Sequence, residues 1–147
     1  MDDHNTAAFS DYAETDMNLL LSGMEQAPFA ALLFLPDAGL TLTWRNEAHA
    51  LMTDTVGLDV IGLPMFEAFP PSEDLEGTAA RDAIYSAVQE MISIGESTDI
   101  GPYRYDLQTG EGGFVEYHWR IRMSPVVSSG RVAAILQVAQ DVTQEVL

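Results

Sequence analysis

The sequence predicts one α+β domain with a five-stranded antiparallel sheet, helices packed on one face and a flanking helix at the N-terminus. Two strand-like segments come first, several helical segments follow, and three strand-like segments end the chain. This order is typical of one antiparallel sheet with its helices on one side. With 147 residues and 47% hydrophobic content, the chain can bury one substantial core and is too short for two ordinary domains.

The N-terminal region precedes the sheet. Residues 1–9 are expected to form a disordered tail, and Ser10 suits the N-cap of a flanking helix over residues 10–25. Residues 26–147 then form the domain. The helix carries an apolar stripe at helical spacing, made of Ala13, Met17, Leu20, Leu21 and Met24. Either this stripe covers the domain's own sheet or it packs against a second copy of the chain, and both interpretations stay open.

The first two strands are predicted to form a hairpin. Pro28 ends the helix, and residues 29–35 are an apolar run that indicates a strand buried on both faces. Residues 36–39 have the composition of a turn. Residues 40–44 follow as the second strand, because leucine and tryptophan alternate there with threonine.

Helical segments connect this hairpin to the rest of the sheet. Asn46 is a suitable cap for a short helix over residues 47–53. Residues 57–71 mix glycine, proline and large apolar residues, which favours short helical turns over the core. Thr78 is the expected cap of the longest helix, residues 79–94, after an acidic link. The inward-facing residues of the short helix are predicted to be Ala48, Leu51 and Met52, and the stripe of the long helix to be Ala80, Ala83, Ile84, Ala87, Val88, Met91 and Ile92.

Three strand patterns end the chain. Residues 103–107 alternate apolar and charged side chains, and a glycine-rich turn at 108–113 leads to the next strand. The last strand, residues 132–139, is apolar on both faces and is therefore expected to be central or covered. In the second of the three, one face carries Val115, Tyr117, Trp119, Ile121 and Met123, and the other carries Glu116, His118, Arg120 and Arg122.

The charge of the chain argues against nucleic acid as a partner. Its 23 acidic residues face only six basic ones, all arginine, so the net charge is -17 and no cationic footprint for phosphates exists. A high-salt habitat or a GC-rich genome explains this acidity more simply than a basic partner does. The start of the chain has no secretory pattern, and no apolar run approaches the ~20 residues of a membrane span. We expect a cytoplasmic segment that makes no membrane contact.

Several landmark segments occur in a fixed order from about Met24 to the C-terminus. They are residues 26–39 (QAPFAALLFLPDAG), 44–48 (WRNEA), 56–57 (VG), 60–66 (VIGLPMF), Trp119, 124–126 (SPV), 130–132 (GRV) and 141–143 (DVT). They resemble the PAS domain family, in which a first strand and turn, an Asn that starts the next helix, a glycine-bearing turn and a closing Asp-x-Thr follow one another in this order. Each motif alone is short, and the order across the chain carries the resemblance.

The resemblance implies a sensory module of a bacterial signal-transduction protein. Such modules lie upstream of a two-component histidine kinase, a cyclic-dinucleotide enzyme or a transcriptional regulator, and they often dimerise. We therefore expect a homodimer through the N-terminal helix and the sheet face, with an effector domain in a longer parent protein. Family members continue as a linker helix after Asp-x-Thr, so we expect this chain to be an excised or truncated domain.

Two residues are candidates for signal transmission. In the family, the Asp and Thr of the closing motif help join the sheet to the signalling helix, which implies this role for Asp141 and Thr143. Both residue types are also good helix caps where a strand leads into a helix. A simple cap without any switching role is the alternative.

The resemblance also implies a ligand pocket between the sheet and the helical segment. A largely apolar cleft with few polar groups is the usual form of a small-molecule site. An ordinary filled core is the simpler interpretation of most of these residues, and it corresponds to a protein–protein interaction or dimerisation domain without a ligand. The candidate lining residues are Phe34, Trp44, Met65, Phe66, Phe69, Ile84, Tyr85, Val88, Tyr103, Tyr105 and Trp119.

Catalytic and cofactor chemistry is limited by composition. No cysteine is present, which excludes disulfides, thiolate nucleophiles, iron–sulfur clusters and a cysteinyl-flavin adduct. His4, His49 and His118 do not have the spacing of a metal site, so no metal and no enzymatic activity is expected. Haem is not expected either, because the resemblance places an axial histidine on the long helix, which has none. Non-covalent flavin stays open, although no flavin motif is present.

One polar stripe concentrates half of the arginines. Arg104, Arg120 and Arg122 lie on two predicted neighbouring strands, beside Glu116 and His118. Cross-strand ion pairs are the simpler interpretation. Binding of an anion or an acidic partner is the alternative.

Overall fold

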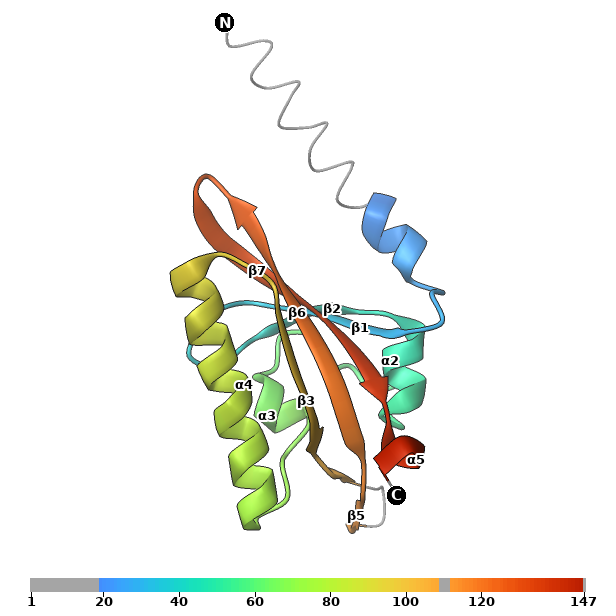
Figure 1. Cartoon of the computed structure of the whole chain (residues 1–147). Helices are drawn as coiled ribbons and strands as arrows, with labels where there is room; N and C mark the ends of the chain where they lie inside the picture. The colour runs from blue at the N-terminus through green and yellow to red at the C-terminus, as the bar shows by residue number, and fades with distance from the viewer. Residues whose placement is uncertain (1–18, 109–111, 147) are drawn as a thin grey trace, which may run out of the picture.

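The computed structural model describes residues 19–108 and 112–146, and Figure 1 shows their arrangement. The predicted tail at residues 1–9 and the first part of the predicted helix at 10–25 lie outside the described residues. Residues 19–24 of that helix are helical. No helix among the described residues is both long enough and apolar enough to cross a membrane.

One five-stranded antiparallel sheet forms the centre of the fold, in the order β2-β1-β7-β6-β3 (Figure 1). The last long strand, β7, is central, which explains why its sequence is apolar on both faces. The predicted sheet and the central position of its last strand are thus confirmed. The strands are β1 Ala30–Phe34, β2 Leu42–Arg45, β3 Thr98–Arg104, β6 His118–Ser128 and β7 Arg131–Asp141.

The helices between β2 and β3 pack on one face of this sheet, as predicted (Figure 1). Asn46 caps α2, since its side-chain oxygen accepts from the backbone N–H of His49. The helices are α2 Glu47–Met52, α3 Met65–Ala68, α4 Leu75–Ile94 and, after the last strand, α5 Thr143–Val146. The buried side chains of sheet and helices meet in one core.

The start of α4 differs from the prediction. The helix begins at Leu75, with Asp74 as its N-cap, and Thr78 lies inside its first turns. The carboxylate of Asp74 accepts hydrogen bonds from the backbone N–H of Gly77 at 2.9 Å and from the hydroxyl of Ser72 at 2.8 Å. The acidic segment predicted as a link is therefore the cap and first turn, where acidic side chains favour the positive end of a helix.

The strand predicted at residues 103–107 is also placed differently. The ladder of β3 with β6 begins at Thr98 and ends at Arg104. Asp106 is buried, and its carboxylate accepts from the Arg104 guanidinium and from the backbone N–H of Tyr117, which turns the chain out of the ladder. A separate ribbon of β4 (Leu107–Gln108) and β5 (Phe114–Val115) follows, so the side chain of Val115 is exposed and does not share the face of Trp119.

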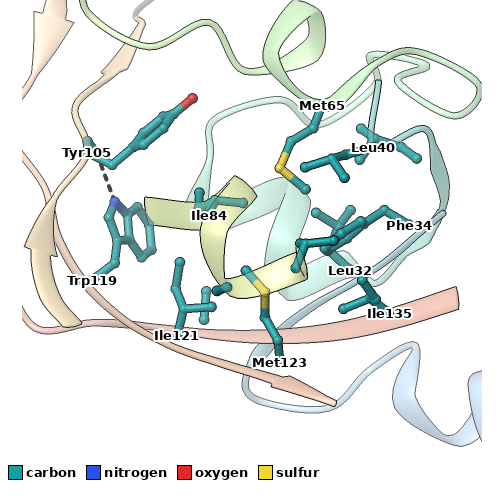
Figure 2. Packing of buried hydrophobic residues seen from close by; sticks show 14 of the residues in the cluster. Leu32, Phe34, Leu40, Met65, Ile84, Tyr105, Trp119, Ile121, Met123 and Ile135 are labelled. Atoms are coloured by element: carbon teal, nitrogen blue, oxygen red, sulfur yellow. Dashed lines mark hydrogen bonds between the residues drawn. The ribbon is translucent and has the colours of Figure 1, made fainter. Parts of the chain in front are cut away.

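The core lies between the inner face of the sheet and the helices. Figure 2 shows Leu32 and Phe34 of β1 beside Ile135 of β7 and Met123 of β6, with Met65 of α3 above them. Leu32, Phe34, Met123 and Ile135 are fully buried. Each such side chain contributes about 1.5–3 kcal/mol relative to an exposed one.

Candidate functional site

A cavity of about 70 Å³ lies between the sheet and the helices, at the end of the core that Tyr105 and Trp119 occupy in Figure 2. Its wall combines the inner faces of β1, β6 and β7 with α2, α3, α4 and the end of β3. Most of the wall is apolar. The lining residues are Ala30, Leu32, His49, Met52, Thr53, Met65, Phe66, Phe69, Ile84, Tyr103, Tyr105, Leu107, Trp119, Ile121, Gln137 and Ala139.

Seven of the eleven residues predicted from the sequence line this cavity. They are Met65, Phe66, Phe69, Ile84, Tyr103, Tyr105 and Trp119. Their role in ligand binding stays a prediction. Phe34 and Val88 belong to the filled part of the core instead, where both are fully buried.

The other two predicted lining residues point elsewhere. Trp44 pairs with Leu33 across the hairpin and so shares the outer face of the sheet, because the register shifts at a bulge between Leu33 and Phe34. Simple alternation would have placed Trp44 with Leu42 on the inner face. Tyr85 is half-buried beside the ring of Phe66, and its hydroxyl donates to the carbonyl of Ala38 at 3.0 Å.

Sequence reasoning missed the polar residues of the wall, above all His49. Its side chain is only 5% exposed, whereas Leu51, which was predicted to face inward, is 62% exposed. The His49 ring meets the Phe69 ring edge-on, with centroids 5.2 Å apart. Burial, and secondarily the nearby charge of Arg45, lowers the pKa of His49 from 6.5 to about 4. The imidazole is therefore neutral near pH 7.

Gln137 is the second missed residue. It lies on the inner face of β7 between Ile135 and Ala139, and it is 8% exposed. The signal was present in the sequence, because the period of two along a strand places Gln137 with its buried neighbours. A lone amide among inward-facing apolar residues is unusual enough to indicate a site.

Two tyrosines close the cavity near β3. The indole Nε1 of Trp119 donates to the carbonyl of Tyr105 at 2.8 Å, the hydrogen bond drawn in Figure 2. The Tyr105 hydroxyl in turn donates to the carbonyl of Phe69. Burial raises the pKa of both Tyr103 and Tyr105, so both phenols are neutral.

The exit from the sheet is held to β6, next to the cavity-lining Trp119. The carboxylate of Asp141 accepts from the backbone N–H of Thr143 at 2.9 Å and from its hydroxyl at 2.5 Å. The Thr143 hydroxyl oxygen accepts from the backbone N–H of His118 at 3.0 Å, and the N–H of Val142 donates to the carbonyl of His118 at 2.8 Å. The start of α5 is thus fixed to the residue that precedes Trp119. A role in transmission stays a prediction for both motif residues.

The entrance to the domain is held by Asn46. Its side chain, 1% exposed, makes hydrogen bonds with four backbone groups. The oxygen accepts from Ala31 and from His49, and the amide donates to the carbonyls of Met24 and Phe29. One buried side chain therefore joins the end of the N-terminal helix, β1 and the cavity-lining turn of α2.

The arginine-rich stripe forms ion pairs, as the simpler interpretation predicted for Arg104 and Arg122. Arg104 pairs with Glu76 at 2.8 Å, Asp106 at 2.9 Å and Glu116 at 3.7 Å, and these partners raise its pKa. Arg122 pairs with Asp99 at 3.2 Å across the strands. Within the described ranges, no group of three or more potential metal-ligating side chains comes together.

Comparisons with known proteins agree with this fold. A family model described as PAS fold matches residues 24–147. No curated protein sequence matches the chain. An RNA-binding light-oxygen-voltage receptor superposes with a TM-score of 0.63 at 21% identity, over 88% of this chain and 34% of that chain. The chain thus spans about a third of the length of that receptor.

Two shorter structures superpose over nearly their full length. The PAS domain of an HTR-like protein from Haloarcula marismortui gives a TM-score of 0.57 at 13% identity, over 92% of this chain and 98% of that chain. The LOV domain of a blue-light activated histidine kinase from Erythrobacter litoralis gives 0.59 at 14% identity, over 81% and 100%. These structures share the fold, and the family model covers most of the sequence. The chain belongs to the PAS fold family.

Proposed function

We propose that this chain is the cytoplasmic sensory module of a bacterial signal-transduction protein, in which the state of the cavity controls the two segments that flank the domain. The parent protein would be a histidine kinase, a cyclic-dinucleotide enzyme or a transcriptional regulator. One observation carries the proposal: a residue of the cavity wall and the neighbour of another are hydrogen-bonded to the two flanking segments. His49 is joined to Met24 through Asn46, and His118, next to Trp119, is joined to Thr143.

In the proposed mechanism, a ligand makes unequal contacts with two placements of α2 and β6. A molecule in the cavity contacts the His49 ring and the Trp119 side chain, and so favours one placement of α2 and of β6. Each placement carries a flanking segment with it, because the connecting hydrogen bonds run to backbone groups. The ligand shifts the balance between the two placements only by the difference in its affinity for them.

The similar structures support a sensory role, and a covalent cysteinyl-flavin adduct does not extend to this chain. They include light-oxygen-voltage receptors and a domain studied with a flavin analogue. No cysteine is present to form an adduct.

We propose no reaction for the domain. The residues that line the cavity include no carboxylate, amine or thiol. Its titratable side chains are one imidazole and two phenols, all held neutral by burial. A general acid–base pair needs groups that ionise near the working pH.

The second candidate is a dimerisation domain that relays a signal without a ligand. The outer face of the sheet carries a half-buried apolar cluster, Leu33 and Trp44 with Leu136 and Val138 of β7. Leu19 and Leu20 of the N-terminal helix are 70% and 65% exposed. Apolar surfaces of this kind mark interaction sites. We propose that both cover each other in a homodimer.

Native and denaturing mass spectrometry of the purified protein, with an absorbance scan, tests both candidates. A small molecule lost on denaturation supports the ligand-sensing module. A ligand-free dimer supports the second candidate, and Leu136→Glu should then convert it to a monomer while Ser86→Glu on the exposed face of α4 does not. A ligand-free monomer contradicts both.

A further inference from the structure

Three buried polar atoms without a hydrogen-bond partner belong to residues that line the same cavity. They are His49 Nδ1, Tyr103 Oη and Gln137 Oε1, and they are the buried side-chain nitrogen and oxygen atoms that lack a partner in the described part of the chain. A buried polar group without a partner costs about 1–3 kcal/mol, so such groups are rare and call for an explanation. Three on one wall indicate a common partner.

The three residues come from different elements of the cavity wall. His49 lies on α2, Tyr103 on β3 and Gln137 on β7, where it pairs with Leu32 of β1 and Met123 of β6. The rest of the wall is largely aliphatic and aromatic. A molecule that meets the three polar atoms is therefore surrounded by apolar groups.

The wall favours an uncharged molecule. It contains no formal charge, since no aspartate, glutamate, lysine or arginine lines the cavity and burial keeps the imidazole and the phenols neutral. An ion without a counter-charge in such surroundings is strongly disfavoured. The ligand must also donate, because the carboxamide oxygen of Gln137 only accepts hydrogen bonds.

The volume sets the size. A cavity of about 150 Å³ holds one benzene ring, so a cavity of about 70 Å³ corresponds to a few waters or to an organic molecule of a few heavy atoms. Waters alone would be held by the three protein atoms and by each other. A small amide or alcohol meets the same atoms and also fills the apolar part of the wall.

We propose that the cavity binds a small, uncharged organic molecule of a few heavy atoms that donates a hydrogen bond to Gln137 and also bonds to Tyr103 and His49. The inference rests on the proposed sensory function and names the chemical class of its ligand. It explains why an amide, a phenol and an imidazole lie unpaired at one end of an otherwise apolar core.

Three probes of nearly identical shape test the proposal. Acetamide donates and accepts hydrogen bonds, acetone only accepts, and acetate is an anion. Each is titrated into the ¹⁵N-labelled protein, and amide shifts are followed by NMR. We expect saturable shifts at cavity-lining residues with acetamide, and at least roughly fivefold weaker binding of acetone and acetate, since a lost buried hydrogen bond costs about 1 kcal/mol or more.

Two variants of the same strand provide the matched comparison. Gln137→Met keeps the length of the side chain and removes the unpaired oxygen, and it should weaken acetamide binding about tenfold while leaving acetone unchanged. Gln140→Met, at an exposed position of β7, should change neither. Tyr103→Phe removes another of the unpaired polar atoms. It serves as the test variant instead if the NMR spectrum of Gln137→Met is not that of a folded protein.

The outcomes separate this inference from the proposed function. Acetone or acetate binding as tightly as acetamide contradicts the chemical class and leaves a ligand-sensing cavity standing. No saturable binding of any probe contradicts the inference, whereas the ligand-sensing function is contradicted only if native mass spectrometry also finds no bound molecule. Acetamide binding that is equal in Gln137→Met and the wild type also contradicts the inference.

Discussion

The side-chain amide of Asn46 donates a hydrogen bond to the backbone carbonyl of Met24 over 2.9 Å. Its oxygen accepts from the backbone N–H of His49 at 3.0 Å, in the first turn of α2. The helix at residues 19–24 is therefore only one side chain away from a residue of the cavity wall. A flexible linker between the helix and the domain would not provide such a direct hydrogen-bonded connection to the cavity wall.

Replacing Asn46 tests this connection. Asn46→Ala removes four hydrogen bonds to buried or half-buried backbone groups, and it should lower the free energy of unfolding by roughly 3 kcal/mol. It should also speed amide exchange in residues 19–24. Thr43→Ala, which removes one exposed hydrogen bond to Leu33, should cost about 0.5 kcal/mol. Urea denaturation and hydrogen exchange measure both, and equal effects of the two variants would refute the role of Asn46.

The burial of His49 predicts a dependence of stability on pH. Its pKa is about 4 in the folded chain and 6.5 when unperturbed, so the unfolded chain takes up a proton first as the pH falls. The contribution of the neutral ring is complete above about pH 6.5 and is lost as the pH falls to about 4, on the order of 3 kcal/mol.

A variant isolates this contribution from that of the many carboxylates. His49→Gln stays neutral throughout, so the difference in unfolding free energy between wild type and variant should shift by about 3 kcal/mol in favour of the variant between pH 7 and pH 4. Urea denaturation at several pH values measures it. A constant difference would mean that His49 is as free to ionise in the folded chain as in the unfolded one.

Two helical glycines should respond in opposite directions to alanine. A Cβ at Gly77 would overlap the backbone carbonyl of Ser72, so Gly77→Ala should destabilise the domain by roughly 3 kcal/mol despite the better helix propensity of alanine. Gly23, in the helix at 19–24, has open space around its Cβ position, and Gly23→Ala should not lower the melting temperature. A neutral Gly77→Ala would show that the cap at Asp74 is looser than described.

The sheet exit can be tested at Thr143. Thr143→Val keeps the shape of the side chain and removes the hydroxyl that bonds to Asp141 and to His118, and it should cost roughly 1 kcal/mol. Thr143→Ser keeps the hydroxyl and should restore slow exchange of the His118 amide. If the His118 amide exchanges equally fast in both variants, the Thr143 hydroxyl does not hold the end of β7 to β6.

The fold was largely predictable from the sequence because its strands follow hydrophobic alternation and its caps have standard chemistry. Asn46 and the central strand β7 are examples. The placement of Trp44 was not predictable, because a bulge shifts the register of the hairpin and no local sequence pattern marks that bulge. The end of β3 depended on the buried carboxylate of Asp106, whose partners are remote in sequence or fixed by the turn itself.

The candidate site was predictable in its apolar part and not in its polar part. Met65, Phe66 and Phe69 follow from any helical segment that covers a sheet. His49 was not expected, since the short helix α2 has too few turns for its periodicity to distinguish the face of Leu51 from that of His49. The period of two along the strand did place Gln137 on the inner face. A polar side chain at that position indicates a site, and this signal was missed.

Coupling between the cavity and both flanking segments is tested most directly by filling the cavity and measuring hydrogen exchange by mass spectrometry. Ala139→Val adds two methyl groups at a residue of the cavity wall, and Ala133→Val makes the same change at an exposed position of β7. We predict that Ala139→Val changes exchange several-fold in residues 19–24 and in Asp141–Val146, while Ala133→Val leaves both segments unchanged. Changes confined to the strands around Ala139 would contradict coupling and would indicate an ordinary core.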